Sequence, residues 1–253
     1  MTNRSKPTQG KPRSRGRTVP KKSRLPLYLG IGMIGIIGLI VVLVNTLNPT
    51  AETAVNLPPR EPLTAAVGQT AEGYWYKGDP NAPVKIVEYA DFECPACAKL
   101  EQELLQTNFD QLYVETGKVQ FIYRELPLTS IHSSAQLTAE VARCAGDQNL
   151  FWPVHDALFD TQKQWERKPN AREIILTAAA KAGASRTQLD SCLAAGTHTA
   201  AVNASTNEAM TRGVQSTPTV YVNDQEVKFV SDFASTLIKL VDGIVASQSS
   251  ATP

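Results

Sequence analysis

The fold of this chain is decided by the stretch VKIVEYADFECPAC, residues 84–97. Its β-branched and aromatic residues at 84–90 predict a buried strand, and the apolar spacing from Ala98 onward predicts a helix. A strand that runs directly into a helix places Cys94 beside unpaired backbone N–H groups and the positive end of the helix dipole, which favour its thiolate. Cys97 lies one helical turn further on, close enough to form or open a disulfide with Cys94.

The order of the remaining elements limits the possible folds. A helix over 98–117, broken near Asn108, and a second strand over 119–124 complete a strand-helix-strand unit. Helices are then predicted at 133–145, 151–161, 171–182, 186–195 and 199–212, strands at 218–222 and 226–230 around the turn Asn223-Asp224, and a last helix at 232–247. This order predicts an α/β protein with a parallel pair of strands, an antiparallel hairpin and helices on the faces of the sheet. In outline that is a thioredoxin fold with an inserted helical subdomain.

The chain before this domain has the composition of a membrane anchor. Residues 1–24 contain nine basic and no acidic side chains, which predicts a disordered tail. Residues 25–47 carry no charge, and about 21 residues of helix cover about 31 Å, enough for one transmembrane helix. A cleaved secretory signal is the alternative. Residues 48–73, rich in Pro, Thr and Ala, are predicted to be a flexible linker to a domain at 74–250, with the helical insertion at about 130–213.

Charge asymmetry predicts the orientation in the membrane. The positive-inside rule places residues 1–24 in the cytoplasm and the catalytic domain outside it, in a single-pass protein of the cell membrane that contacts lipid through its span. Removing the nine tail residues from the total of 25 Lys and Arg leaves 16 basic against 24 acidic residues, a net charge of −8. Nucleic-acid binding is therefore not expected. All four cysteines lie in the external part, where disulfides persist.

Three motifs together resemble the bacterial DsbA-like thiol:disulfide oxidoreductases, and most of all their membrane-anchored, thioredoxin-like members. They are IVEYADFECPAC at 86–97, FWPVHDALF at 151–159 and STPTV at 216–220, and the resemblance covers about residues 78–245. It implies an enzyme without a prosthetic group that forms disulfides in secreted or membrane proteins. It also implies cysteine-containing unfolded substrates and a membrane redox partner of the DsbB or vitamin K epoxide reductase type.

The resemblance assigns different roles to the two cysteines of the pair. Cys94 would be the nucleophile that forms a mixed disulfide with the substrate, and Cys97 would resolve it. A plain disulfide or half of a metal site is the alternative, but the sequence has no second Cys-x-x-Cys or His pair to complete a zinc site. Ala96 stands where strongly oxidising members often carry histidine, so we expect a less extreme pKa for Cys94.

The STPTV motif supplies Thr217 and Pro218. In the resembled family this bond is cis and faces the cysteine pair, which a proline allows at low cost. The backbone of Thr217 would then pair with an extended substrate segment, and the ring of Pro218 would shield the sulfurs from metals. The alternative is an ordinary trans proline that begins an edge strand.

Glu88 is a carboxylic acid within the predicted strand. Because side chains alternate along a strand, it shares a face with Ile86 and Ala90. Burial would raise its pKa and suit it to accept the proton of Cys97, and an acid here also matches the resembled family. An exposed glutamate at a sheet edge is the alternative.

The other two cysteines, Cys144 and Cys192, fall on the apolar faces of two predicted helices. We expect a structural disulfide between them outside the membrane, worth about 4 kcal/mol for a loop of this size in the chain-entropy model. Two buried, inert thiols are the alternative.

No role in catalysis is expected for the remaining ionisable residues near the motifs. Asp91 and Glu93 are expected to be exposed charges that water and salt screen. The three histidines, His132, His155 and His198, do not form a site and are expected to pack or to cap helices.

The sequence leaves the direction of the reaction open, because the direction depends on a reduction potential. A reductase or isomerase would use the same pair of cysteines as an oxidase. A non-catalytic thioredoxin-like module that binds peptides or metals is a third, less favoured interpretation.

Overall fold

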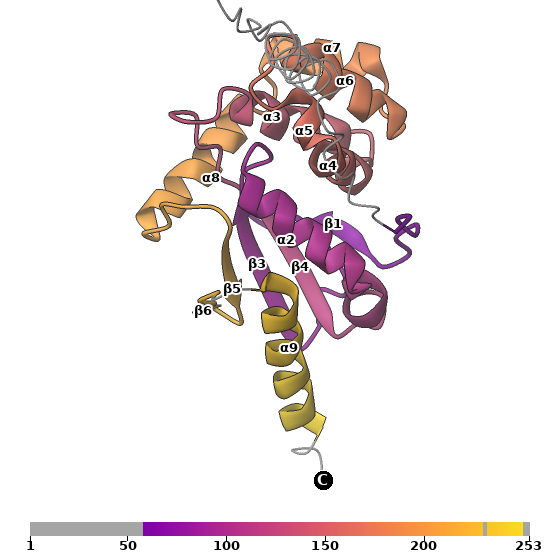
Figure 1. The fold of residues 1–253 in the computed structure, drawn as a ribbon, viewed down its shortest axis with the longest axis vertical. Helices are drawn as coiled ribbons and strands as arrows, with labels where there is room; N and C mark the ends of the chain where they lie inside the picture. Colours follow the sequence, from indigo (N-terminus) through magenta and orange to yellow (C-terminus); the bar gives the residue numbers. More distant parts are fainter. Residues whose placement is uncertain (1–57, 230–231, 250–253) are drawn as a thin grey trace, which may run out of the picture. The chain divides into compact units, whose positions relative to one another are not determined.

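The computed structural model describes residues 58–229 and 232–249 (Figure 1). The predicted basic tail at 1–24 and the predicted transmembrane helix at 25–47 lie outside these residues. Within the described ranges, no helix has both the length and the apolar character that a membrane span requires.

A six-stranded mixed sheet forms the centre of the domain, in the order β1-β2-β4-β3-β5-β6. The predicted parallel pair is present at its middle, where β3 (Val84–Ala90) runs beside β4 (Val119–Glu125). The other neighbours pair in antiparallel fashion: β1 (Val67–Gln69), β2 (Trp75–Lys77), β5 (Thr219–Val222) and β6 (Gln225–Glu226). Both β3 and β4 are therefore flanked on each side, which explains their nearly continuous burial.

The edges of the sheet differ from the prediction. Strands β1 and β2 were not predicted, and β1 lies within residues 48–73, the stretch interpreted as a linker. Both are three-residue strands, too short to show a period-2 pattern. At the opposite edge, β6 contains only Gln225–Glu226 instead of the predicted 226–230.

Helix α2 (Pro95–Gln106) follows β3, and a π-helical turn at Asp110–Val114 continues it after a break. The break lies where it was predicted, because Asn108 has a left-handed backbone conformation with φ of 52°. The inserted helices between β4 and β5 are α3 (Ala135–Gly146), α4 (Phe151–Asp160), α5 (Gln162–Trp165), α6 (Ala171–Lys181), α7 (Arg186–Ala195) and α8 (Thr199–Thr211). Of these, only the single-turn helix α5 was not predicted. The chain ends in α9 (Phe233–Ser249).

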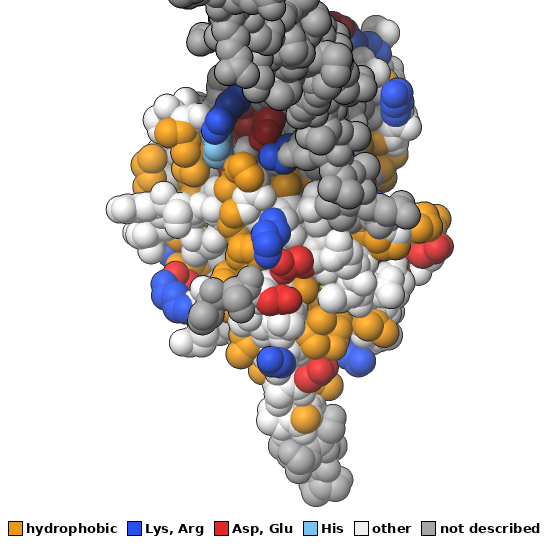
Figure 2. Space-filling view, viewed as in Figure 1, with side chains coloured by type: hydrophobic (Ala, Val, Ile, Leu, Met, Phe, Trp, Pro, Cys, Tyr) orange, Lys and Arg blue, Asp and Glu red, His pale blue; other side chains and the backbone are white. Residues whose placement is uncertain are grey.

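Helices cover both faces of the sheet. On one face α2 and α9 lie side by side over β3 and β4 (Figure 1), and α4 packs against α2. On the other face, Ala209 of α8 packs against Val87 and Tyr89 of β3 and Ile122 of β4. The α/β thioredoxin fold with an inserted helical region is thus confirmed. On the face seen in Figure 2, the described basic and acidic side chains are interspersed.

Candidate active site

The cysteine pair lies at the junction of β3 and α2. Cys94 is the N-cap residue of α2, with φ of −75° and ψ of 122°, and Pro95 occupies the first turn, where its missing N–H costs nothing. Cys94 is 7% exposed and Cys97 is fully buried. Both are free thiols, so the structure has the pair in its reduced form.

The two sulfurs have opposite acidities. A hydrogen bond from the Cys97 thiol, helped by Thr217 and the backbone N–H groups of Cys97 and Ala96, outweighs desolvation and lowers the pKa of Cys94 from 9.0 to about 6. Burial, together with the hydrogen bond and charge of Cys94, raises the pKa of Cys97 well above its usual value. At neutral pH the outer sulfur is therefore a thiolate and the inner one a thiol.

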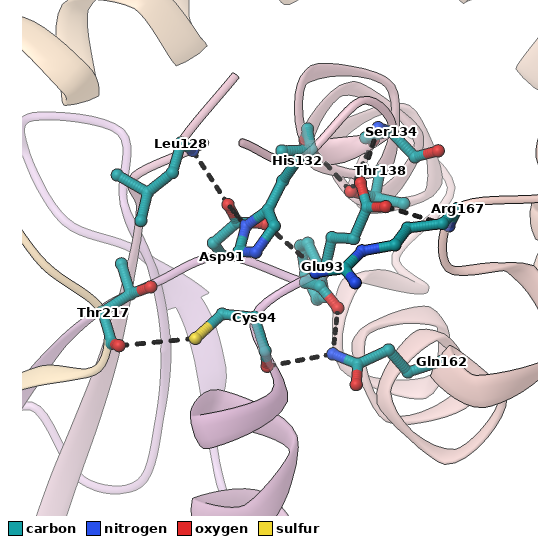
Figure 3. Close-up of polar contacts among 12 residues, drawn as sticks. Asp91, Glu93, Cys94, Leu128, His132, Ser134, Thr138, Gln162, Arg167 and Thr217 are labelled. Atoms are coloured by element: carbon teal, nitrogen blue, oxygen red, sulfur yellow. Dashed lines mark hydrogen bonds and ion pairs between the residues drawn. The ribbon is translucent and has the colours of Figure 1, made fainter. Parts of the chain in front are cut away.

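The loop before β5 brings Thr217 and Pro218 to the cysteine pair. The peptide bond between them is cis. The Sγ atom of Cys94 lies 3.3 Å from the carbonyl oxygen of Thr217, to which the thiol form donates (Figure 3). The structure thus brings together residues that are 123 positions apart in the sequence.

Glu88 is fully buried on the central strand β3, so the alternative of an exposed glutamate at a sheet edge is wrong. Desolvation raises its pKa well above 4.5, and the charge of Glu101 adds to this effect, whereas Lys77 opposes it. Glu101 and Lys77 were not singled out in the sequence. The available signal for Glu101 was its spacing of four residues from Cys97, which places both on the buried face of α2.

Asp91 is buried, 2% exposed, and not a screened surface charge as expected. Its Oδ1 accepts a hydrogen bond from the N–H of Glu93 at 2.8 Å, and its Oδ2 accepts one from the N–H of Leu128 at 2.8 Å. The Nδ1 atom of His132 lies 2.7 Å from the same Oδ2 (Figure 3). The carboxylate therefore fastens the segment after β4 to the loop that carries Cys94.

Glu93 is equally buried, again contrary to the expectation of an exposed charge. Its two oxygens accept hydrogen bonds from the backbone N–H groups of Ser134, at 2.6 Å, and Arg167, at 3.2 Å (Figure 3). These bonds satisfy a carboxylate that burial would otherwise destabilise. The two acids adjoin the cysteines because they position the loop, not because they react.

Gln162, on the unpredicted helix α5, completes the support of this loop. Its Nε2 atom donates to the carbonyl oxygens of Phe92 at 2.7 Å and Cys94 at 3.0 Å (Figure 3). The side chain is buried, and the Cys94 carbonyl also accepts from the N–H of Ala98 at 3.2 Å. Nothing in the sequence near Gln162 indicated this contact.

Cys144 and Cys192 are joined by a disulfide between α3 and α7, with an S–S distance of 1.98 Å. It lies in the inserted helices and is separate from the Cys94 and Cys97 pair. His198 bonds Asp147 at 2.8 Å beside it.

Two groups of side chains have the spacing of metal ligands within the described part of the chain. In the first, Cys144, Cys192 and His198, the two sulfurs are already bonded to each other. In the second, Glu101, His155 and Asp156, Arg60 lies 3.4 Å from Asp156 and already compensates its charge. Neither group argues for a resident metal.

Comparison with known proteins agrees with this geometry. A family model described as thioredoxin matches residues 70–241. The chain belongs to the thioredoxin family. It is 42% identical over 88 residues to the Na(+)/H(+) antiporter NhaA 3 of Salinispora tropica, covering 35% of this chain and 13% of the antiporter. It is 32% identical over 99 residues to the probable disulfide bond formation protein D of Bacillus anthracis, covering 39% of this chain and 45% of that protein.

Among solved structures, oxidised BdbD from Bacillus subtilis superposes with a TM-score of 0.61 at 22% identity, over 72% of this chain and 98% of BdbD. At that identity the likeness concerns the fold. The chain spans about an eighth of the antiporter and less than half of the Bacillus anthracis protein. The predicted resemblance to DsbA-like members of the thioredoxin family is confirmed.

Proposed function

We propose that this chain is a membrane-anchored thiol:disulfide oxidoreductase that forms disulfides in secreted or membrane proteins outside the cytoplasm. One observation carries the proposal: Cys94 caps the N-terminus of α2 with its sulfur 3.3 Å from the carbonyl oxygen that precedes the cis Pro218, an environment that lowers the pKa of Cys94 to about 6 while burial raises that of Cys97 well above 9.0. A structural disulfide or a zinc site requires no such asymmetry. A thiol-disulfide exchange reaction requires this difference in pKa, because the sulfur of Cys94 must leave easily while that of Cys97 is held as a thiol.

The reaction follows from the two acidities. A substrate thiolate attacks Sγ of Cys94 in the oxidised pair, the bond between the two cysteines breaks, and Cys97 leaves with the electron pair and takes up a proton. A second substrate thiolate then attacks the substrate sulfur of the mixed disulfide, and Cys94 leaves as a thiolate. The substrate gains one disulfide, and the enzyme is reduced by two electrons.

In this scheme Thr217 and Pro218 would receive the substrate. The Thr217 carbonyl lies 3.3 Å from the Cys94 sulfur, so backbone hydrogen bonds to an extended peptide would bring a substrate cysteine to that sulfur. Glu88, buried and with a raised pKa, would exchange the proton with Cys97. The anchor at 25–47 would hold the domain at the membrane, near a reoxidising partner of the DsbB or vitamin K epoxide reductase type.

The oxidase direction is favoured over the reductase or isomerase direction by the pKa of Cys94. Stabilising the thiolate stabilises the reduced enzyme, which makes the pair more oxidising. A pKa of about 6 lies between that of thioredoxin, about 7, and that of DsbA, about 3.5. Their potentials are about −270 and −120 mV, so the lowered pKa supports a pair that is more oxidising than thioredoxin.

The direct test is trapping of the mixed disulfide by the full-length chain in detergent. Cys97→Ser should accumulate a covalent adduct with a peptide whose cysteine is held in a mixed disulfide with glutathione, because the Cys94 thiolate attacks that disulfide and glutathione leaves as a thiolate, and Cys94→Ser should form none. The double variant Cys144→Ala with Cys192→Ala is the control and should react like the wild type. Equal trapping by both single variants would contradict the assignment of the nucleophile, and no reaction by the wild type would favour a non-catalytic binding module.

A further inference from the structure

The disulfide between α3 and α7 lies beside two further side chains that can bind a metal ion. The sulfurs of Cys144 and Cys192 and a ring nitrogen of His198 lie within 4.8 Å of one another. The Oδ2 atom of Asp147 lies 4.0 Å from the Cys192 sulfur and 2.8 Å from Nε2 of His198. Two sulfurs, one imidazole and one carboxylate are a set of donors typical of zinc. The proposed reaction uses none of them.

The ends of three helices bring these four residues together. Cys144 lies in the last turn of α3, and Asp147 is the C-cap residue of that helix. Cys192 lies in the last turn of α7, and His198 is the N-cap residue of α8. Helix α3 packs against both α7 and α8. The four donors are therefore held by packed helices, which keep them close whether or not the two sulfurs are bonded to each other.

The electrostatics of this place favour a cation. The C-terminal ends of α3 and α7 each present the negative end of a helix dipole, and α7 has no basic side chain in its last turn. The basic residue in the last turn of α3, Arg143, donates to Glu125 at 2.7 Å instead. Asp147 adds a negative charge at a helix end that disfavours one, and in the described part of the chain its ion pair is with His198. A disulfide carries no charge that would compensate for this arrangement, whereas a bound cation would.

The two thiols can reach the spacing that zinc requires. With Zn–S bonds of about 2.3 Å and Zn–N bonds of about 2.0 Å, the ligand atoms of a tetrahedral site lie about 3.3–3.8 Å apart. The Cα atoms of Cys144 and Cys192 are 6.0 Å apart, so rotation of the side chains separates the sulfurs while the helices stay in place. Cys144 is buried and the side chain of Asp147 is 51% exposed, so an ion can enter from the side of Asp147.

We propose that Cys144, Cys192, His198 and Asp147 bind zinc in the chain whose Cys144–Cys192 disulfide has not formed or has been reduced. The ion replaces the protons of the two thiols, so two protons leave for each ion bound. When a disulfide of another molecule accepts the two electrons of these thiolates, the bond between the two sulfurs forms and the ion is released. The structure described above is this second, metal-free form. The helices are thus joined by zinc or by the disulfide, and never by both.

The zinc form protects a newly made chain from wrong disulfides. Before oxidation the chain has four thiols, and a bond from Cys94 to Cys144 or Cys192 would block the redox pair. Thiolates that hold zinc share their electron pairs with the ion and are less available for exchange. The inference does not depend on the proposed function, because metal binding and thiol exchange use different cysteines.

The test uses the full-length chain in detergent, without a histidine tag, with Cys94→Ser and Cys97→Ser so that the redox pair cannot bind metal. The protein is reduced with a phosphine, separated from it by gel filtration under nitrogen, and titrated with Co²⁺ alone and then with Zn²⁺. We expect the intense visible bands of tetrahedral cobalt and a sulfur-to-cobalt charge-transfer band, both lost when zinc displaces cobalt. The oxidised form of the same protein should give neither band.

Two substitutions identify the other ligands by competition for zinc with a chromophoric chelator. His198→Ala should weaken zinc binding by about 100-fold, and Asp147→Asn by about 10-fold to 100-fold. Asp190→Asn is the matched control, because Asp190 is an acid of α7 close to Cys192 that is paired with Arg186 at 2.9 Å. This control should bind zinc as tightly as the protein without the substitution.

Weak cobalt bands typical of oxygen ligands would overturn the site, and so would an unchanged zinc affinity in His198→Ala. Equal binding by the oxidised protein would also overturn it, because the sulfurs would then not be ligands. Circular dichroism decides the case in which the reduced chain loses its helices. Recovery of the helical signal with zinc, absent when Cys144→Ser is added, would support the site, and no recovery would overturn it.

Discussion

The free energy of unfolding of the reduced wild type should rise with pH more than that of the reduced Cys94→Ser variant, because the sulfur of Cys94 is ionised in the folded protein. In the folded protein the pKa of Cys94 is about 6, against 9.0 for the unperturbed thiol. Because the folded value is the lower one, the thiolate stabilises the fold fully above pH 9, and this stabilisation is lost as pH falls through 6.

The size of the effect follows from these two values. At pH 7 the shift contributes about 1.4 kcal/mol to the free energy of unfolding, and at pH 5 it contributes about 0.1 kcal/mol. Cys97 adds nothing to this difference, because its raised pKa leaves it protonated in both states over the same range. Reduced wild type should therefore gain about 1.3 kcal/mol relative to reduced Cys94→Ser between pH 5 and pH 7.

Urea unfolding of both proteins at pH 5 and pH 7, followed by tryptophan fluorescence under reducing conditions, measures this double difference. Reduction of Cys144 and Cys192 affects both proteins equally, so its contribution cancels. A double difference below about 0.3 kcal/mol would show that the environment of Cys94 does not favour the thiolate, and the reasoning about the helix terminus would fail. A gain at the lower pH would refute its sign.

Three further substitutions test the scaffold by urea unfolding. Replacing Cys144 and Cys192 by alanine should lower the free energy of unfolding by about 4 kcal/mol, because their disulfide closes a loop with a sequence separation of 48. The rate of thiol exchange should not change, and a slower exchange would show that this disulfide contributes to the reaction. Gln162→Ala should cost about 1–3 kcal/mol, because the buried carbonyl of Phe92 loses its side-chain donor and that of Cys94 keeps only the N–H of Ala98, and a neutral result would mean that water replaces Gln162. Gly146→Ala should cost about 1–3 kcal/mol, because the added Cβ would lie 2.2 Å from the ring of Trp75, and unchanged stability would show that this ring can move aside.

The central part of the fold was predictable because its signals are local. The apolar run at 84–90 and the helix start at Pro95 each follow from a few adjacent residues, and together they define the parallel unit and the cysteine pair. Strands β1 and β2 were not predictable, since three residues carry no period and their pairing depends on β4.

The residues of the candidate site were predictable only where they belong to a recognisable sequence motif. Cys94 and Cys97 follow from their spacing, whereas the burial of Asp91 and Glu93 depends on backbone N–H groups that arrive from residues 128–167. A charged residue beside a motif is usually solvated, and only the tertiary structure shows that donors replace the water. Glu101 was missed because its burial comes from the packing of α2 against neighbouring elements, which the sequence does not show.

The attachment of Arg60 would shorten the connection between the domain and the predicted membrane span. Its guanidinium forms two hydrogen bonds with Asp160 and lies 3.4 Å from Asp156, so the chain is fastened to α4 from residue 60 onward. A fully extended linker of residues 48–59 spans at most about 40 Å, whereas the predicted linker of residues 48–73 could span about 90 Å. With the predicted span, a shorter linker would limit how far from the lipid the cysteine pair can act on a substrate.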